Sequence, residues 1–296
     1  MENKILSTID TYTGNPFGHP NEDHGTLVAS FAAAETDGGS ALASIGFNTM
    51  LRFYDCSSSN YFSLAEIAYH ASFEDGVDVI NCSLNNTYST PTITPRERLL
   101  VKEILDNGTV IVRCAGNTQG SYDNDRLPFA HQVDSRIIIV SSTGSDDKHT
   151  CNCSGSVHST HANYPEVDIC APGYCVIGRT RYDNGNNLHL YKRDNGSSYA
   201  SPIVAGVCTL LKSINKNFTP AEIEHFIKTT ADPIADAHLF PGIVGAGRVN
   251  AYKAVRAAMC IVKQNPLFDS ITILNSKIEE KNTPFYSIIF HIPFYE

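Results

Sequence analysis

Four residues in this sequence are of types that together cleave acyl bonds, and their chain order is Asp10, His24, Asn117 and Ser198. A serine hydroxyl is a weak nucleophile near neutral pH and needs a base within hydrogen-bond reach. Histidine can take that proton and later give it to the leaving group, because its ordinary pKa lies near neutrality. A buried carboxylate fixes the imidazole tautomer, and an amide N–H donor stabilises the developing oxyanion.

Each of these residues alone has an ordinary structural explanation. A histidine at a helix start is commonly a cap or a surface residue. A serine before a helix fits an N-cap, and an asparagine after a strand is a common turn residue. Only the joint order of acid, histidine, asparagine and serine favours nucleophilic catalysis.

The elements that must position these residues follow from hydrophobic patterning. Val- and Ile-rich runs alternate with amphipathic segments, which predicts an α/β fold: a doubly wound, mostly parallel sheet with helices on both faces. Ligands of such sheets bind beyond the carboxyl ends of the strands, where Asp10 and Asn117 fall. The expected strands are residues 4–9, 50–54, 78–83, 109–114 and 136–141, and the expected helices are 24–34, 63–75, 95–107, 199–214, 220–230 and 250–262.

No repeat, linker or composition break interrupts residues 1–262, so we expect one domain there. Residues 174–182 and 187–193 flank an Asp-Asn-Gly turn and predict a hairpin. Residues 263–296 form a separate C-terminal extension of unknown role, in which 271–274 and 285–292 have strand-like patterns, so we expect a β-rich tail, such as an added ribbon.

Composition excludes several classes of function. The 296 residues carry 31 acidic and 22 basic side chains, a net charge of −9, without blocks of like charge. Nucleic-acid binding and polybasic membrane contact are therefore not expected. No apolar run reaches the roughly 18 residues of a membrane span, and the N-terminus lacks the apolar core of a signal peptide.

Nine cysteines are an odd number, so at least one is unpaired within the chain. The pairs Cys151/Cys153 and Cys170/Cys175 match no strong zinc spacing, so we predict no metal site there, and disulfides stay open. Three others lie in apolar runs and are expected to be small buried hydrophobes: Cys82, Cys114 and Cys208.

Five segments together resemble the subtilisin-like serine proteases, the subtilase family or peptidase S8 type. The His-Gly-Thr box stands as His24-Gly25-Thr26, and the oxyanion segment, usually Ala-Ala-Gly-Asn, as Cys114-Ala115-Gly116-Asn117. The serine box, usually Gly-Thr-Ser-Met-Ala-x-Pro, stands as Gly196-Ser197-Ser198-Tyr199-Ala200-Ser201-Pro202. Residues 77–84 and 168–173 are similar to the family's substrate-binding strand and Ala-Pro-Gly turn. The resemblance covers residues 4 to 262 in family order.

The resemblance implies a subtilisin-like catalytic domain and a serine endopeptidase that works through an acyl-enzyme. Asp10, His24 and Ser198 are then the triad, and the Asn117 side chain and the Ser198 backbone N–H are the oxyanion donors. Gly196 lets the backbone turn sharply beside the substrate. We expect Pro202 in the first turn of its helix, where the missing N–H costs nothing.

Two departures from the family pattern concern this site. Asp10 lacks the glycine that usually follows two residues later, and His24 comes only 14 residues after it, although 14 extended residues can span about 46 Å. Asp23 and Glu22 are rivals, but a neighbour in sequence is badly placed to face the histidine ring. Asn85 begins an Asn-Asn pair where the family has Gly-Gly, which narrows or reshapes the groove for an extended substrate.

The walls of the first specificity pocket are also implied by the resemblance: Ser83, Leu84, Asn85, Cys114, Ala115 and Gly116. The preferred substrate side chain stays undetermined. The chemistry requires no cofactor, and residues 35–39 do not reproduce the family's calcium loop, so structural calcium has no ligands that we can name. The resemblance further implies a polypeptide substrate, an inhibitory prodomain not found in these residues, and a secreted or cell-envelope location.

Two alternatives compete with a protease. A catalytically impaired pseudoprotease that only binds peptides is motivated by the departures at Asp10 and Asn85. An esterase of the α/β-hydrolase fold requires a G-x-S-x-G elbow and the order Ser, Asp, His. The segment around Ser198 does not match that elbow, and the histidine box precedes the serine, so this alternative fails.

Overall fold

The expected Val- and Ile-rich segments form a parallel sheet. The computed structural model describes residues 5–10, 23–36, 42–55, 63–84, 93–117, 129–150, 166–183, 188–264 and 285–291. Within these ranges the main sheet has seven strands, and all neighbours run parallel. In spatial order they are β1 (Ile5–Asp10), β2 (Thr49–Asp55), β9 (Phe285–His291), β3 (Val79–Cys82), β4 (Val110–Cys114), β5 (Ile138–Thr143) and β6 (Ile169–Pro172).

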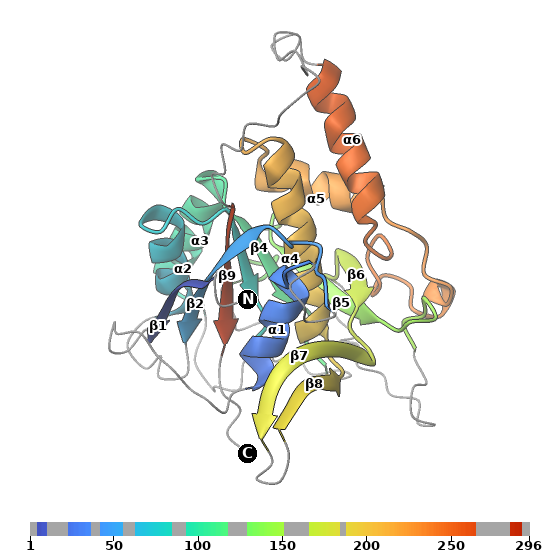
Figure 1. Cartoon of the computed structure of the whole chain (residues 1–296). Helices are drawn as coiled ribbons and strands as arrows, with labels where there is room; N and C mark the ends of the chain where they lie inside the picture. The colour runs from blue at the N-terminus through green and yellow to red at the C-terminus, as the bar shows by residue number, and fades with distance from the viewer. Residues whose placement is uncertain are drawn as a thin grey trace, which may run out of the picture.

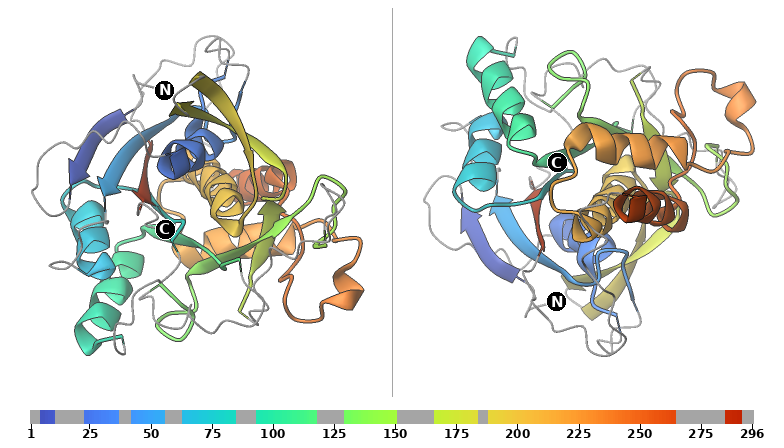
Figure 2. Two further views of the ribbon diagram at one scale, coloured as in Figure 1. Left: turned by 90° about the horizontal axis from the view of Figure 1, so that it is seen from below. Right: turned by 90° about the horizontal axis from the view of Figure 1, so that it is seen from above.

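Helices cover both faces of this sheet (Figures 1 and 2). One face carries α2 (Leu64–Phe73) and α3 (Pro95–Asp106). The other carries α1 (Asp23–Ala33), α4 (Ser197–Ile214), α5 (Pro220–Thr229) and α6 (Ala251–Gln264), and a short 3₁₀ turn spans Ala237–Leu239. Reciprocal capping boxes start α2, α3 and α5, as the sequence predicts for α5.

Alternation along the buried strands divides the core into two layers. Ile80 and Ile111 face α2 and α3, whereas Val79 and Val112 face α4 and its neighbours. Because successive strand residues point to opposite faces, a sheet covered on both sides needs continuous apolar strands. The three cysteines predicted as buried hydrophobes are fully buried and free: Cys82, Cys114 and Cys208.

Cys170 and Cys175 are free as well, so they do not pair with each other. The pair Cys151/Cys153 lies outside the described residues. No helix among those described is long and apolar enough to cross a membrane.

The predicted hairpin is present as β7 (Val176–Asp183) and β8 (Leu188–Asp194), an antiparallel pair that packs over α1 (Figure 1). A Cβ atom at Gly178 would come within 2.7 Å of the Leu27 side chain and 2.9 Å of Phe31. The close packing of the hairpin on α1 therefore depends on this glycine.

The strand expected near the end of the sequence is also present, but its location differs from the prediction. β9 lies inside the sheet, between β2 and β3, rather than in an added ribbon (Figure 1). Its register pairs His291 with Asp55 of β2, and Phe290 with Cys82 of β3. β1 and β6 are the two edge strands of this sheet. The other strand-like stretch, residues 271–274, lies outside the described residues.

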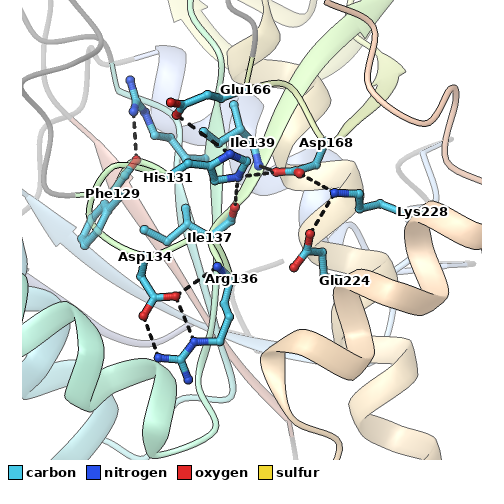
Figure 3. A network of polar contacts seen from close by, with 11 residues as sticks. Phe129, His131, Asp134, Arg136, Ile137, Ile139, Glu166, Asp168, Glu224 and Lys228 are labelled. Carbon is cyan, nitrogen blue, oxygen red and sulfur yellow. Dashed lines mark hydrogen bonds and ion pairs between the residues drawn. The ribbon is translucent and has the colours of Figure 1, made fainter. Parts of the chain in front are cut away.

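A polar network joins the segment before β5 to β6 and α5 (Figure 3). Asp168 is buried immediately before β6 and accepts hydrogen bonds from the Ile139 N–H and from His131 Nε2, each 2.8 Å long. Lys228 Nζ donates to its other oxygen over 2.8 Å and to Glu224 over 2.9 Å. The network lies at the amino end of β6, away from the carboxyl ends of the strands, which indicates a structural role.

This network predicts a pH-dependent stability. Burial disfavours the charged imidazole, but the hydrogen bond and charge of Asp168, with Glu166 nearby, raise the pKa of His131 above 6.5. Stability from protonated His131 is therefore fully present below the unfolded pKa and is lost as pH rises through the higher folded pKa. We expect the unfolding free energy to fall by about 1 kcal/mol from about pH 6 to about pH 8.

The matched variant for this prediction is His131→Gln, which keeps an N–H donor for Asp168 but cannot titrate. Its stability, measured by urea unfolding, is expected to lose that pH dependence. An identical pH dependence in both proteins would contradict the prediction.

Candidate active site

The candidate site gathers around the first turn of α4, at the carboxyl ends of β3 and β4. Ser198 is the second residue of α4, and Gly196 is its N-cap. Asn117 follows the end of β4 by three residues. His24 lies in the first turn of α1, which packs against α4. The fold thus brings His24, Asn117 and Ser198 to one end of two packed helices.

Ser197 fixes the orientation of the Asn117 amide. Asn117 Oδ1 accepts a hydrogen bond from the Ser197 backbone N–H over 2.8 Å, and lies 3.0 Å from Ser197 Oγ. Ser197 Oγ also contacts the Gly116 backbone, at 3.0 Å from its N and 2.8 Å from its O. Because Oδ1 is the acceptor in these contacts, the NH₂ end of the amide is the end left to act as a donor.

Gly196 is required by both its conformation and its surroundings. Its φ of +154° lies in a region that side chains disfavour, and a Cβ atom there would lie 3.2 Å from Asn117 Nδ2. Any other residue at this position would press on the amide that Ser197 orients.

The position of Pro202 differs from the sequence prediction. It is the sixth residue of α4, beyond the first turn, so its missing N–H leaves the Ser198 carbonyl without its helical donor. Ser83 Oγ donates to that carbonyl over 2.7 Å, and a series of hydrogen bonds between buried side chains holds Ser83 in place. Asn81 Nδ2 donates to Ser83 Oγ over 2.9 Å, and Ser201 Oγ donates to Asn81 Oδ1 over 2.7 Å. These side chains therefore fix the first turn of α4, which contains Ser198, to the end of β3.

Tyr199 is a residue of the site that the sequence reasoning missed. Its ring centroid lies 5.6 Å from that of His24 and 5.6 Å from that of Phe31. Its hydroxyl donates to Asp194 Oδ2 over 2.9 Å, which anchors the far end of the side chain. The available signal was an aromatic residue at the position where the family usually has methionine.

The expected pocket walls converge at the ends of β3 and β4. Cys114 Sγ donates to the Leu84 carbonyl over 3.5 Å, and Ala115 is buried beside them. Burial raises the pKa of the Cys114 thiol, although Arg113 and Ser198 act in the opposite direction. A neutral thiol is a poor nucleophile, so Cys114 does not compete with Ser198 for that role.

Asp10 closes β1 at the edge of the sheet. The register places it beside Asp55 of β2, which pairs in turn with His291 of β9. β2 and β9 therefore stand between Asp10 and β3. The side chains of Asp10 and Asp23 lie outside the described part of the chain, as do residues 22 and 85.

Within the described ranges, no group of three or more His, Cys, Asp or Glu side chains is placed to hold a metal ion. The segment 35–39, which does not resemble a calcium loop, is described only at Glu35 and Thr36.

Comparisons with known proteins identify the relatives of this chain. A thermophilic serine proteinase of Bacillus sp. (strain AK1) is 31% identical over 259 residues, which cover 86% of this chain and 57% of that relative. Subtilisin DY of Bacillus licheniformis is 23% identical over 256 residues, covering 86% of this chain and 85% of that protein.

Among solved structures, a protease from Pseudoalteromonas arctica has a TM-score of 0.63 at 23% identity, covering 87% of this chain and 85% of that one. This likeness confirms the predicted fold. The family model described as the subtilase family matches residues 4–249, well over half of the sequence. This chain belongs to the subtilase family.

Proposed function

We propose that this protein is a serine endopeptidase, which cleaves polypeptides through an acyl-enzyme. The observation that carries the proposal is the arrangement at the start of α4. There Ser197 orients the Asn117 amide beside Ser198, and His24 lies against the adjacent Tyr199. Oriented amide donors beside a serine at a helix N-terminus are suited to stabilising an oxyanion.

In the proposed mechanism, Ser198 Oγ attacks the peptide carbonyl while His24 accepts its proton. The negative charge on the carbonyl oxygen is met by Asn117 Nδ2 and by the Ser198 backbone N–H. His24 then protonates the leaving amine. In the second half, His24 deprotonates a water molecule that attacks the acyl carbonyl, and it returns this proton to Ser198 Oγ as the acid product leaves. From the resemblance of the sequence around it to the family, we assign the acid that orients His24 to Asp10, although the sheet register places β2 and β9 between Asp10 and β3.

The remaining parts of the proposal follow from family membership. The partner is a polypeptide substrate, an inhibitory prodomain is a further partner, and the location is outside the cell or in its envelope. Structural calcium has no assigned ligands.

A fluorophosphonate probe tests the activity, since it reacts with an activated serine. We expect the folded protein to be labelled, Ser198→Ala to lose labelling completely, and Ser213→Ala, an exposed serine on the same helix, to keep it. Cleavage of casein should follow the same order. If the folded wild type binds peptides but is neither labelled nor active, the endopeptidase proposal is wrong and the protein is a peptide-binding pseudoprotease.

Tyr199 is expected to act as a positioning residue for His24. Removing the ring in Tyr199→Leu should lower kcat about fivefold with little change in KM, because an aromatic contact is worth about 1 kcal/mol and a misplaced base slows the chemical step. Tyr199→Phe keeps the ring and should stay within about threefold of the wild type. Steady-state kinetics on one peptide substrate compare the three. A larger loss in Tyr199→Phe than in Tyr199→Leu would contradict this role.

A further inference from the structure

Arg113, near the end of β4, has a fully buried side chain whose guanidinium is only partly satisfied. Nη1 donates to the Phe129 carbonyl over 2.8 Å. Among the described residues, Nε and Nη2 are both buried and have no hydrogen-bond partner, and no ion pair involves Arg113.

A guanidinium is permanently charged, and burying it without an anion is costly. Two other cations of the described chain are satisfied. Lys212, also buried, donates to three backbone carbonyls at 2.7 to 3.1 Å. Arg136 pairs with Asp134 and Asp106. Among the described residues, Arg113 therefore lacks the anionic partner that a buried guanidinium requires.

The position of Arg113 relates this charge to the candidate site. It pairs with Cys82 of β3 in the sheet and immediately precedes the oxyanion segment that begins at Cys114. Burial raises the pKa values of both thiols, and the Arg113 charge opposes that rise at each. The guanidinium thus acts electrostatically on the ends of both strands that are expected to wall the first specificity pocket.

The two unsatisfied groups also indicate the kind of anion. Nε–H and Nη2–H lie along one edge of the planar guanidinium and point the same way, and two parallel donors match the two oxygens of a carboxylate. Phe129 O holds the opposite side through Nη1, which leaves that fork free to bind.

We propose that Arg113 is the specificity residue of this protein, and that it binds the carboxylate of a glutamate on the acyl side of the cleaved bond. Glutamate is favoured over aspartate because the Arg113 side chain is fully buried, so the substrate carboxylate must reach it on the longer side chain. The inference rests on the proposed endopeptidase activity and names its substrate class.

Peptides of the form acetyl-Ala-Ala-Ala-X-aminomethylcoumarin test the inference, with X as Glu, Gln or Phe. For the wild type at neutral pH, kcat/KM for Glu should exceed that for Gln by about tenfold or more, because a charge-assisted pair adds at least about 1.5 kcal/mol. In Arg113→Met the ratio of Glu to Gln should fall to about one. Arg113→Lys, which keeps the charge without the fork, should give an intermediate ratio.

A second measurement needs no variant, in case Arg113→Met fails to fold by circular dichroism. For the wild type, the ratio of Glu to Gln should fall as pH drops through the ordinary glutamate pKa of about 4.3, because the substrate carboxylate becomes neutral. The Gln peptide cancels pH effects on the enzyme itself.

The two proposals fail in different ways. If Ser198 is labelled by the fluorophosphonate and the Gln or Phe peptide is cleaved at least as well as the Glu peptide, the role of Arg113 is wrong and the endopeptidase stands. If neither labelling nor cleavage of any peptide occurs, the proposed activity itself is wrong.

Discussion

Asp10→Asn is expected to lower kcat by about 10⁴-fold, the loss seen when the acid of a serine-protease triad becomes an amide. The asparagine keeps the size of the side chain but presents a donor, which selects the wrong imidazole tautomer. KM should change little, because the acid does not touch the substrate. Fluorophosphonate labelling of Ser198 should slow in parallel with kcat, as both depend on the same base.

The matched control is Asp55→Asn, since Asp55 occupies the paired position at the end of the neighbouring strand. We expect this change to leave kcat within about tenfold of the wild type. The two variants test two different positions in the sheet, because Asp10 ends the edge strand β1 and Asp55 ends β2, the direct neighbour of β9. If Asp55→Asn causes the large loss and Asp10→Asn does not, the triad acid is Asp55.

Asn117→Leu is expected to reduce kcat by about 10²- to 10³-fold, again with little effect on KM. That magnitude is the measured cost of losing one such oxyanion donor in a member of this same family. The donor contributes mainly in the transition state, when the carbonyl oxygen carries charge, so the loss falls on kcat. Kinetics with a neutral peptide substrate measure it.

The Asn117→Asp variant distinguishes two roles of this side chain: donating an N–H to the oxyanion and holding Ser197 in position. Aspartate retains an oxygen for the Ser197 contacts at 2.8 and 3.0 Å, but has no N–H to offer. It should therefore be at least as impaired as Asn117→Leu. Near-normal activity in Asn117→Asp would mean that holding Ser197 is the main function of this side chain.

Much of the fold was predictable because its signals are local. Continuous Val and Ile runs predict strands buried on both faces, and the capping box at Thr219 predicts the start of α5, which begins at Pro220. The boundary of α4 was missed by two residues, because the helix begins through an N-cap glycine with no side-chain acceptor.

Other features depend on contacts that no local pattern contains. Pro202 is tolerated one turn further into α4 because Ser83, which directly follows β3 and is far away in sequence, donates to the Ser198 carbonyl. The contact between Tyr199 and His24 joins two helices more than 160 residues apart in sequence. Arginine side chains are rarely fully buried, so an arginine in a strand predicts an exposed position. The sequence therefore could not predict that Arg113 is buried.

The central place of β9 has a consequence for how the protein folds. β2 and β3 are separated by fewer than 30 residues, but the strand that joins them in the sheet comes from residues 285–291. During synthesis, the two flanking strands leave the ribosome long before their common neighbour exists. Pairings of such sequence separation form slowly, so assembly should wait for a late step and expose two unpaired strand edges until then. Chaperone dependence and aggregation of nascent chains are thus expected costs of this topology.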